Sequence, residues 1–157
     1  AATAAEDVHV PVRLLAGSCD GITPLADHQQ LIYNHANAPK QLAVFVNGVH
    51  QGFSEGPISL PETCDAGAME KSKQLALSCA WLTAWFDYYL KQDASLEELV
   101  WGDGLHDDPL VEVQSAAGAA PKTSTPTMTP TVTPRPTRTM RPPCTSDCKY
   151  YFPFQGH

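Results

Sequence analysis

The sequence predicts an α/β domain over residues 1–115, followed by a tail that does not fold. Two observations predict this division. Short apolar runs with the character of buried strands enclose a segment with helix signals, and a long apolar helix follows them. Beyond residue 120 the composition changes to a repeat of Thr and Pro. A folded segment of about 110 residues is large enough to bury a hydrophobic core.

The first half of this domain has the pattern of a strand, a helix and a second strand. Val10–Ala16 and Gln41–Val46 are the two apolar runs, and Gly or Asn-Gly ends each of them, which is typical of strands covered on both faces. Between them, Thr23 and Pro24 predict a helix with Thr23 as N-cap, running from Pro24 to about Ala36. Such a unit places its two strands parallel, in a sheet that needs further strands.

The second half is expected to contain one dominant helix. A loop rich in Gly, Pro and Ser over residues 52–67 leads into a helix from about 68 to 91. A further turn is expected at 96–100, an acidic loop at 103–108, and a short strand or irregular segment at 110–113. The long helix has two apolar stripes: Leu75, Cys79, Leu82, Phe86 and Tyr89 in one, and Leu77, Trp81, Trp85 and Tyr88 in the other. Together they predict a wide face packed on the sheet.

Residues 116–143 are predicted to be a linker, and residues 144–157 a short Cys-containing tail that starts another module. Seven Pro and eight Thr fall within residues 121–143, a composition that stays extended and disordered. The net charge of the whole chain is −7, divided into −11 for residues 1–120 and +4 for the remainder. An acidic domain argues against nucleic acid as a partner. No apolar run reaches the roughly 20 residues of a transmembrane segment.

Five cysteines allow two interpretations. Cys64 and Cys79 flank a loop and part of the long helix, Cys144 and Cys148 lie close together in the tail, and Cys19 is left over. The first four are disulfide candidates if the protein is extracellular or at the cell surface. Reduced, buried thiols in a cytosolic protein are the alternative. No Cys-x-x-Cys pair or zinc-finger spacing is present, so no metal site is predicted.

The residues most suited to chemistry follow the two parallel strands. Asp20 lies in the turn GSCDG after the first strand, and His50 lies in NGVHQG after the second. The carboxyl ends of parallel strands meet at one edge of a sheet, so these residues are expected to be neighbours. A carboxylate that accepts Nδ1–H of histidine fixes the tautomer and leaves Nε2 to take a proton from a nucleophile. The sequence therefore predicts an acid–base pair.

The segments GSCDGITP and GVHQGF resemble the acid- and histidine-bearing turns of the α/β-hydrolase superfamily, in which the serine precedes both. The loop with Cys64 and the aromatic helix ending in YYLK are similar to those of dienelactone-hydrolase-like esterases. The resemblance covers about residues 8–100. It implies a partial hydrolase fold, namely the last parallel strands and helices of a doubly wound sheet.

By this resemblance the chain is the C-terminal part of a carboxylesterase- or lipase-like serine hydrolase. Asp20 would be the triad acid and His50 the general base, acting on a small-molecule ester with no cofactor. The serine and the oxyanion-hole donors would belong to an N-terminal half upstream of Ala1, so this chain alone is expected to be inactive. A prolyl-oligopeptidase-type peptidase and a non-catalytic extracellular module on a Thr/Pro stalk are the alternatives.

Other interpretations of single residues stay open. Asp20 is also suited to capping the predicted helix, and His50 to an ordinary loop position. Residues 52–56 (GFSEG) match G-x-S-x-G around Ser54, but they lack the strand before and the helix after that a nucleophile elbow requires. Cys19 as a nucleophile would use His50 as its base; otherwise it fills the turn or forms a disulfide with a cysteine of the expected upstream part.

Overall fold

The described part of the chain, residues 2–56 and 64–118 of a computed structural model, folds around a three-stranded mixed sheet. The strands lie in the order β1 (Val12–Gly17), β2 (Lys40–Phe45) and β3 (Val111–Ala116). β1 and β2 are parallel, as predicted, and β3 pairs antiparallel with β2. The expected α/β organisation is confirmed at this level, and the sheet is mixed instead of purely parallel.

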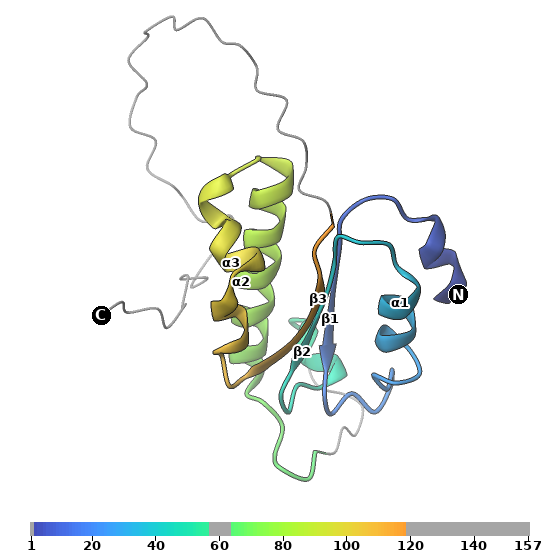
Figure 1. The fold of residues 1–157 in the computed structure, drawn as a ribbon. Helices are drawn as coiled ribbons and strands as arrows, with labels where there is room; N and C mark the ends of the chain where they lie inside the picture. Colours follow the sequence, from blue (N-terminus) through green and yellow to red (C-terminus); the bar gives the residue numbers. More distant parts are fainter. Residues whose placement is uncertain (1, 57–63, 119–157) are drawn as a thin grey trace, which may run out of the picture.

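Helices cover both faces of the sheet. Figure 1 shows α1 (Gln29–His35) on one side and α2 (Lys71–Leu90) with α3 (Glu97–Trp101) on the other. Four short 3₁₀ helices complete the described elements: η1 (Ala2–Asp7), η2 (His50–Phe53), η3 (Ala94–Leu96) and η4 (Asp103–His106). The molecule therefore has three layers, with β2 in the middle of the central one.

β2 is buried on both faces, and its alternation divides the core into two. Leu42 and Val44 pack towards α1, in a cluster with Ala16 of β1. Ala43 and Phe45 pack on the opposite side, in a cluster that includes Trp81 of α2. This is the behaviour expected of a central strand whose side chains point alternately to the two faces.

A polar network joins β1, β2, α2 and α3 beneath the helices. Gln41 is fully buried, and its Nε2 donates to the Val100 carbonyl oxygen at 2.5 Å. Its Oε1 accepts from Arg13 Nε at 2.8 Å and also from Arg13 Nη2. Arg13 Nη1 donates to the Trp81 carbonyl oxygen at 2.6 Å. Burial lowers the pKa of Arg13 to about 9, partly offset by Tyr89, so the guanidinium stays charged at neutral pH.

The helix after β1 begins later than the sequence predicts. Thr23 is not its N-cap, because the Thr23 hydroxyl donates to Asp20 instead. Pro24 opens a turn in which its carbonyl accepts from Asp27 N and His28 N. His28, with φ −128° and ψ −85°, then interrupts helical geometry. The helix therefore covers only the second half of the predicted range.

The long helix lies within its predicted range, but only one of its two stripes is buried. Glu70 caps α2 by accepting from Ser72 N and Lys73 N at 3.1 and 3.2 Å. Trp81 and Trp85 pack into the core, whereas Phe86 of the other stripe is 50% exposed. The prediction of one wide buried face was therefore wrong at Phe86, in the stripe that begins at Leu75.

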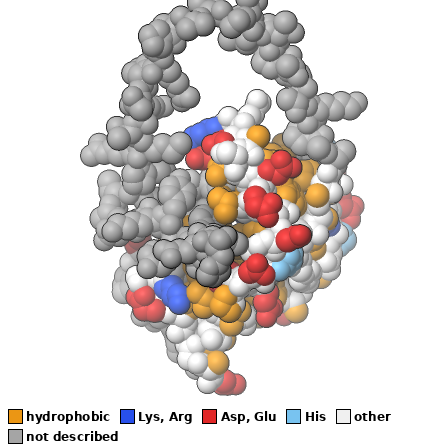
Figure 2. Space-filling model, turned by 60° about the vertical axis from the view of Figure 1, so that its left-hand side comes forward, with side chains coloured by type: hydrophobic (Ala, Val, Ile, Leu, Met, Phe, Trp, Pro, Cys, Tyr) orange, Lys and Arg blue, Asp and Glu red, His pale blue; other side chains and the backbone are white. Residues whose placement is uncertain are grey.

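The segment expected at residues 110–113 is a strand that runs further, to Ala116. On the face shown in Figure 2, acidic side chains are more evident than basic ones, in keeping with the net charge of −11 over residues 1–120. Within the described ranges, none of the helices combines the length and the apolar character of a membrane span.

The Gln41 network gives a first prediction. Gln41→Leu leaves the Arg13 Nε–H and the Val100 carbonyl without their partner in a buried place, so it should lower the free energy of unfolding by about 2–4 kcal/mol. Urea unfolding followed by circular dichroism measures the change. Gln114→Leu on β3 is the matched control: it also breaks amide hydrogen bonds, those with Gln30, but at an exposed site where water replaces them, so the expected change is below about 1 kcal/mol. Equal stabilities of the two variants would contradict this role for the network.

Candidate functional site

The turns that follow β1 and β2 touch each other, and two glycines make the contact possible. A Cβ on Gly17 would lie 2.3 Å from the Gly48 carbonyl oxygen, so no larger residue fits there. Cys19 N donates to that same Gly48 oxygen at 2.9 Å, and Asn47 N donates to Ser18 Oγ at 2.8 Å. Asn47 has a φ of 60°, a left-handed conformation that Asn tolerates. The two turns are thus fixed against each other.

Asp20 is buried at the end of the first turn, with both carboxylate oxygens occupied. Oδ1 accepts from the backbone N–H groups of Ile22 at 3.0 Å and Thr23 at 2.7 Å. Oδ2 accepts from Thr23 Oγ1 at 2.8 Å and lies 3.0 Å from His50 Nδ1. The alternative that Asp20 caps the helix is wrong, because α1 begins only at Gln29 and its N-cap position is His28. Asp20 instead holds its own turn with one oxygen and faces the histidine with the other.

Burial disfavours the charged form of Asp20, but the hydrogen bonds outweigh it. Two backbone N–H groups, the Thr23 hydroxyl and His50 together hold the pKa of the Asp20 carboxyl below its usual value. Asp20 is consequently ionised at neutral pH and can only accept. His50 Nδ1 therefore carries its proton towards Asp20, which leaves Nε2 as the acceptor nitrogen.

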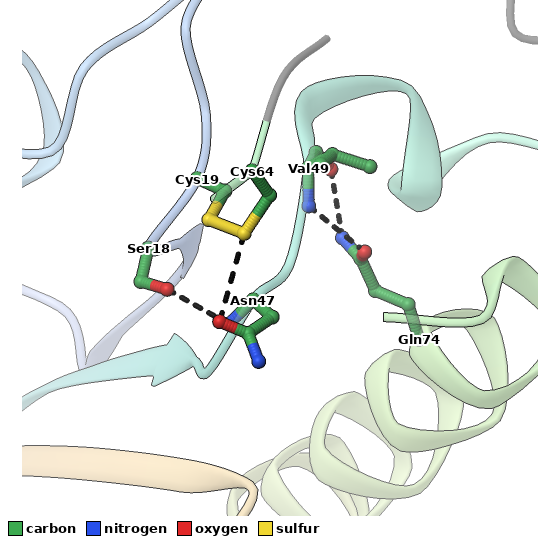
Figure 3. The surroundings of a disulfide bond; sticks show 6 residues. All are labelled: Ser18, Cys19, Asn47, Val49, Cys64 and Gln74. Carbon is green, nitrogen blue, oxygen red and sulfur yellow. Dashed lines mark hydrogen bonds between the residues drawn. A yellow bond between two sulfur atoms is a disulfide. The ribbon is translucent and has the colours of Figure 1, made fainter. Parts of the chain in front are cut away.

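His50 is held by a residue of α2. Gln74 is fully buried, and its side-chain amide pairs with the backbone of Val49, the residue before His50. Gln74 Oε1 accepts from Val49 N at 3.1 Å, and Nε2 donates to Val49 O at 2.9 Å (Figure 3). A Cβ on Gly52 would lie 2.1 Å from Gln74 Oε1, so a larger residue there would displace the Gln74 amide from Val49. The His50 side chain stays 41% exposed, with Nε2 available for a ligand.

A pocket of about 280 Å³ opens beside the pair. Polar and apolar side chains from both turns, β1, α1 and η2 line it: Leu15, Asp20, Thr23, Gln29, His50, Gln51, Phe53 and Ser54. The volume is at the small end of ligand-binding pockets, which are about 300–1,000 Å³. A proton acceptor, a buried anion and an apolar wall in one pocket suit proton transfer on a small ligand.

Ser54 lines the same pocket without the geometry of a nucleophile elbow. It follows η2, has the extended backbone angles φ −130° and ψ 154°, and donates its hydroxyl to the Gln51 carbonyl oxygen at 3.2 Å. An elbow serine lies on a sharp turn between a strand and a helix. As the sequence indicates, Ser54 therefore lacks the directly preceding strand and the directly following helix of a nucleophile elbow.

The disulfide partner of Cys64 is Cys19, not Cys79. The two Cα atoms are 5.4 Å apart, and the bridge spans 45 residues. The sequence left the pairing open, with Cys64 and Cys79 among the candidates, and the structure presents Cys19, in the turn after β1, to Cys64 (Figure 3). Cys64 Sγ also lies 3.6 Å from Asn47 Oδ1, so both turns meet at the bridge. Cys144 and Cys148 lie outside the described residues.

Sequence reasoning found Asp20 and His50 but missed the groups that support them. The sequence predicts a helix cap at Thr23 and assigns no role to Gln74. The sequence carries no clear signal for Gln74, because other polar residues precede it in the first turn of the helix. Among the described residues, no group of three or more His, Cys, Asp or Glu side chains is arranged to hold a metal ion.

The lowered pKa of Asp20 predicts how acid affects stability. Because the folded pKa is depressed, the stabilisation is complete above the unfolded value of about 3.9 and is lost as pH falls through the folded value. Urea midpoints should therefore decline more steeply below about pH 4 for the wild type than for Asp20→Asn. Parallel curves for the two proteins would show that this carboxyl is not stabilised by folding.

The Cys19–Cys64 bridge predicts a sensitivity to reductant. Closing a 45-residue loop removes entropy from the unfolded chain, so losing the bridge should cost about 4 kcal/mol of unfolding free energy. Urea unfolding with and without reductant measures it. The double variant Cys19→Ala/Cys64→Ala should start near the reduced wild type and lose much less on reduction. Equal reductant effects on both proteins would point to a different pairing.

The geometry of the site can be compared with that of known proteins. The site combines a buried Asp, a half-exposed His and a small pocket, all at the edge where two parallel strands end. No family model, no curated protein and no solved structure matches the chain. A function for this site is therefore inferred from its own contacts.

Proposed function

We propose that this chain is the acid- and base-bearing C-terminal part of a serine hydrolase of the α/β-hydrolase fold that cleaves carboxylic esters. The observation that carries the proposal is the 3.0 Å contact between His50 Nδ1 and Asp20 Oδ2. These side chains come from the carboxyl ends of adjacent parallel strands, and the Asp precedes the His along the chain. Both features suit the last two members of a catalytic triad.

In the proposed reaction, a serine from a segment upstream of Ala1 attacks the ester carbonyl. His50 Nε2 accepts the serine proton as the bond forms, and Asp20 stabilises the resulting imidazolium. The imidazolium then gives its proton to the departing alkoxide, which leaves as an alcohol. Water repeats the cycle on the acyl-enzyme: His50 takes its proton, the acid is released and the serine is regenerated.

Two further features support the proposal. The pocket beside His50 is small and has an apolar wall that includes Leu15 and Phe53, which suits a small ester. The bridge between Cys19 and Cys64 suits an oxidising compartment, so we propose an extracellular or cell-surface location. The acidic charge of residues 1–120 argues against nucleic acid as a substrate.

The test compares paired variants in the protein extended upstream to include the serine. His50→Ala and Asp20→Asn should each lower kcat for a short-chain nitrophenyl ester by about 10³–10⁴-fold, because the serine loses its base or the base loses its tautomer. His28→Ala and Asp27→Asn remove the same side-chain types from exposed neighbouring positions and should leave kcat within about twofold. Full turnover in His50→Ala or Asp20→Asn would overturn the assigned roles.

The isolated 157-residue chain separates the alternatives. It should not turn over the ester above the rate of buffer, because it lacks the proposed serine. Turnover by the isolated chain that Ser54→Ala abolishes would make Ser54 the nucleophile and refute the two-part enzyme. Inactivity of the extended protein on esters, with cleavage of a prolyl peptide, would favour a peptidase. Inactivity on both would favour a non-catalytic module.

A further inference from the structure

The hydroxyl of Thr23 lies between the two members of the pair. Thr23 Oγ1 is 2.8 Å from Asp20 Oδ2 and 3.1 Å from His50 Nδ1. Gln29, at the start of α1, reaches the same oxygen with Nε2 at 3.4 Å. We propose that Thr23, oriented by Gln29, is a positioning residue that fixes the tautomer of His50. This role deepens the proposed hydrolase function and rests on it.

Donor accounting gives the hydroxyl proton a direction. An amide nitrogen can only donate, so Gln29 Nε2 uses a lone pair of Thr23 Oγ1. An ionised carboxylate can only accept, so the single hydroxyl proton of Thr23 points to Asp20 Oδ2. His50 Nδ1 then faces two oxygens that both present lone pairs, Oδ2 at 3.0 Å and Oγ1 at 3.1 Å.

That arrangement is compatible with only one form of the neutral imidazole. A proton on Nδ1 satisfies both oxygens, whereas a bare Nδ1 would place its lone pair against the carboxylate. Without the hydroxyl, the backbone N–H groups of Ile22 and Thr23 would hold only Oδ1. The carboxylate could then tilt and move Oδ2 away from the ring. The Thr23 hydroxyl therefore keeps Oδ2 aimed at the ring, and Nε2 stays unprotonated at the pocket.

Thr23→Val isolates this effect, because it replaces the hydroxyl by a methyl group of similar size and keeps the backbone N–H bond to Asp20. NMR of the His50 ring nitrogens and of the Asp20 carboxyl carbon, measured on the 157-residue chain, reports the state of both side chains. The wild type should show the Nδ1–H form of neutral His50. Thr23→Val should raise the pKa of Asp20, because one donor is lost, and turn the His50 signals into a mixture of tautomers.

Thr23→Ser retains the hydroxyl and should restore both signals to wild-type values. Thr83→Val, a matched change on α2, should leave both unaltered. If Thr23→Val does not fold, Gln29→Leu serves instead: it removes the donor that orients the hydroxyl and should also introduce the second tautomer. Wild-type tautomer and wild-type Asp20 titration in folded Thr23→Val, or in Gln29→Leu if that replaces it, would overturn the proposal.

Kinetics separates this inference from the proposed function. In the extended protein, Thr23→Val should lower kcat about tenfold with KM unchanged, the size expected for one ordinary hydrogen bond. If the extended protein cleaves no ester but the NMR results hold, the hydrolase proposal fails and the positioning role of Thr23 stands. If esters are cleaved but Thr23→Val keeps the wild-type tautomer, the positioning role fails alone.

Discussion

The contact between Gly17 and Gly48 is the constraint on which the candidate site depends. Only residues without a Cβ let the ends of β1 and β2 come so close, and that closeness brings Asp20 within 3.0 Å of His50. A parallel pair of strands supplies the coarse neighbourhood, since both strands end at the same edge of the sheet. The close approach at Gly17 and Gly48 then brings the Asp20 carboxylate within hydrogen-bond distance of the His50 ring.

Supports from three directions then hold the pair. Gln74 of α2 forms hydrogen bonds with the backbone of Val49, and the Thr23 hydroxyl donates to the Asp20 carboxylate. The Cys19–Cys64 disulfide links the turn after β1 to the loop that leads to α2. None of these groups needs to touch a ligand. They remove the freedom that a half-exposed histidine on a short 3₁₀ turn would otherwise have, which is the requirement for acid–base chemistry at fixed geometry.

Elements with a strong apolar pattern could be predicted from the sequence, and so could the pairing of Asp20 with His50. The spacing of apolar residues in β1, β2 and α2 indicates in each case which type of secondary structure can bury them. Thr23 and Cys64 could not be assigned from the sequence, because each had two candidate partners. Thr23 had a helix to cap and a carboxylate to bind, and Cys64 had Cys79 nearby in sequence and Cys19 nearby in space. The Thr23–Asp20 bond joins residues only three apart, so local spacing allowed it but did not rank it above a helix cap. The Cys19–Cys64 pairing joins residues 45 apart, a tertiary contact that local spacing does not encode.

The bridge has a topological consequence for both members of the pair. Asp20 and His50 fall inside the ring of chain that Cys19 and Cys64 close. A protease that cuts once anywhere within that ring would produce two polypeptides still joined by sulfur. After a cut between Asp20 and His50, the acid and the base would still belong to one covalent molecule, and reduction of the bridge would separate them.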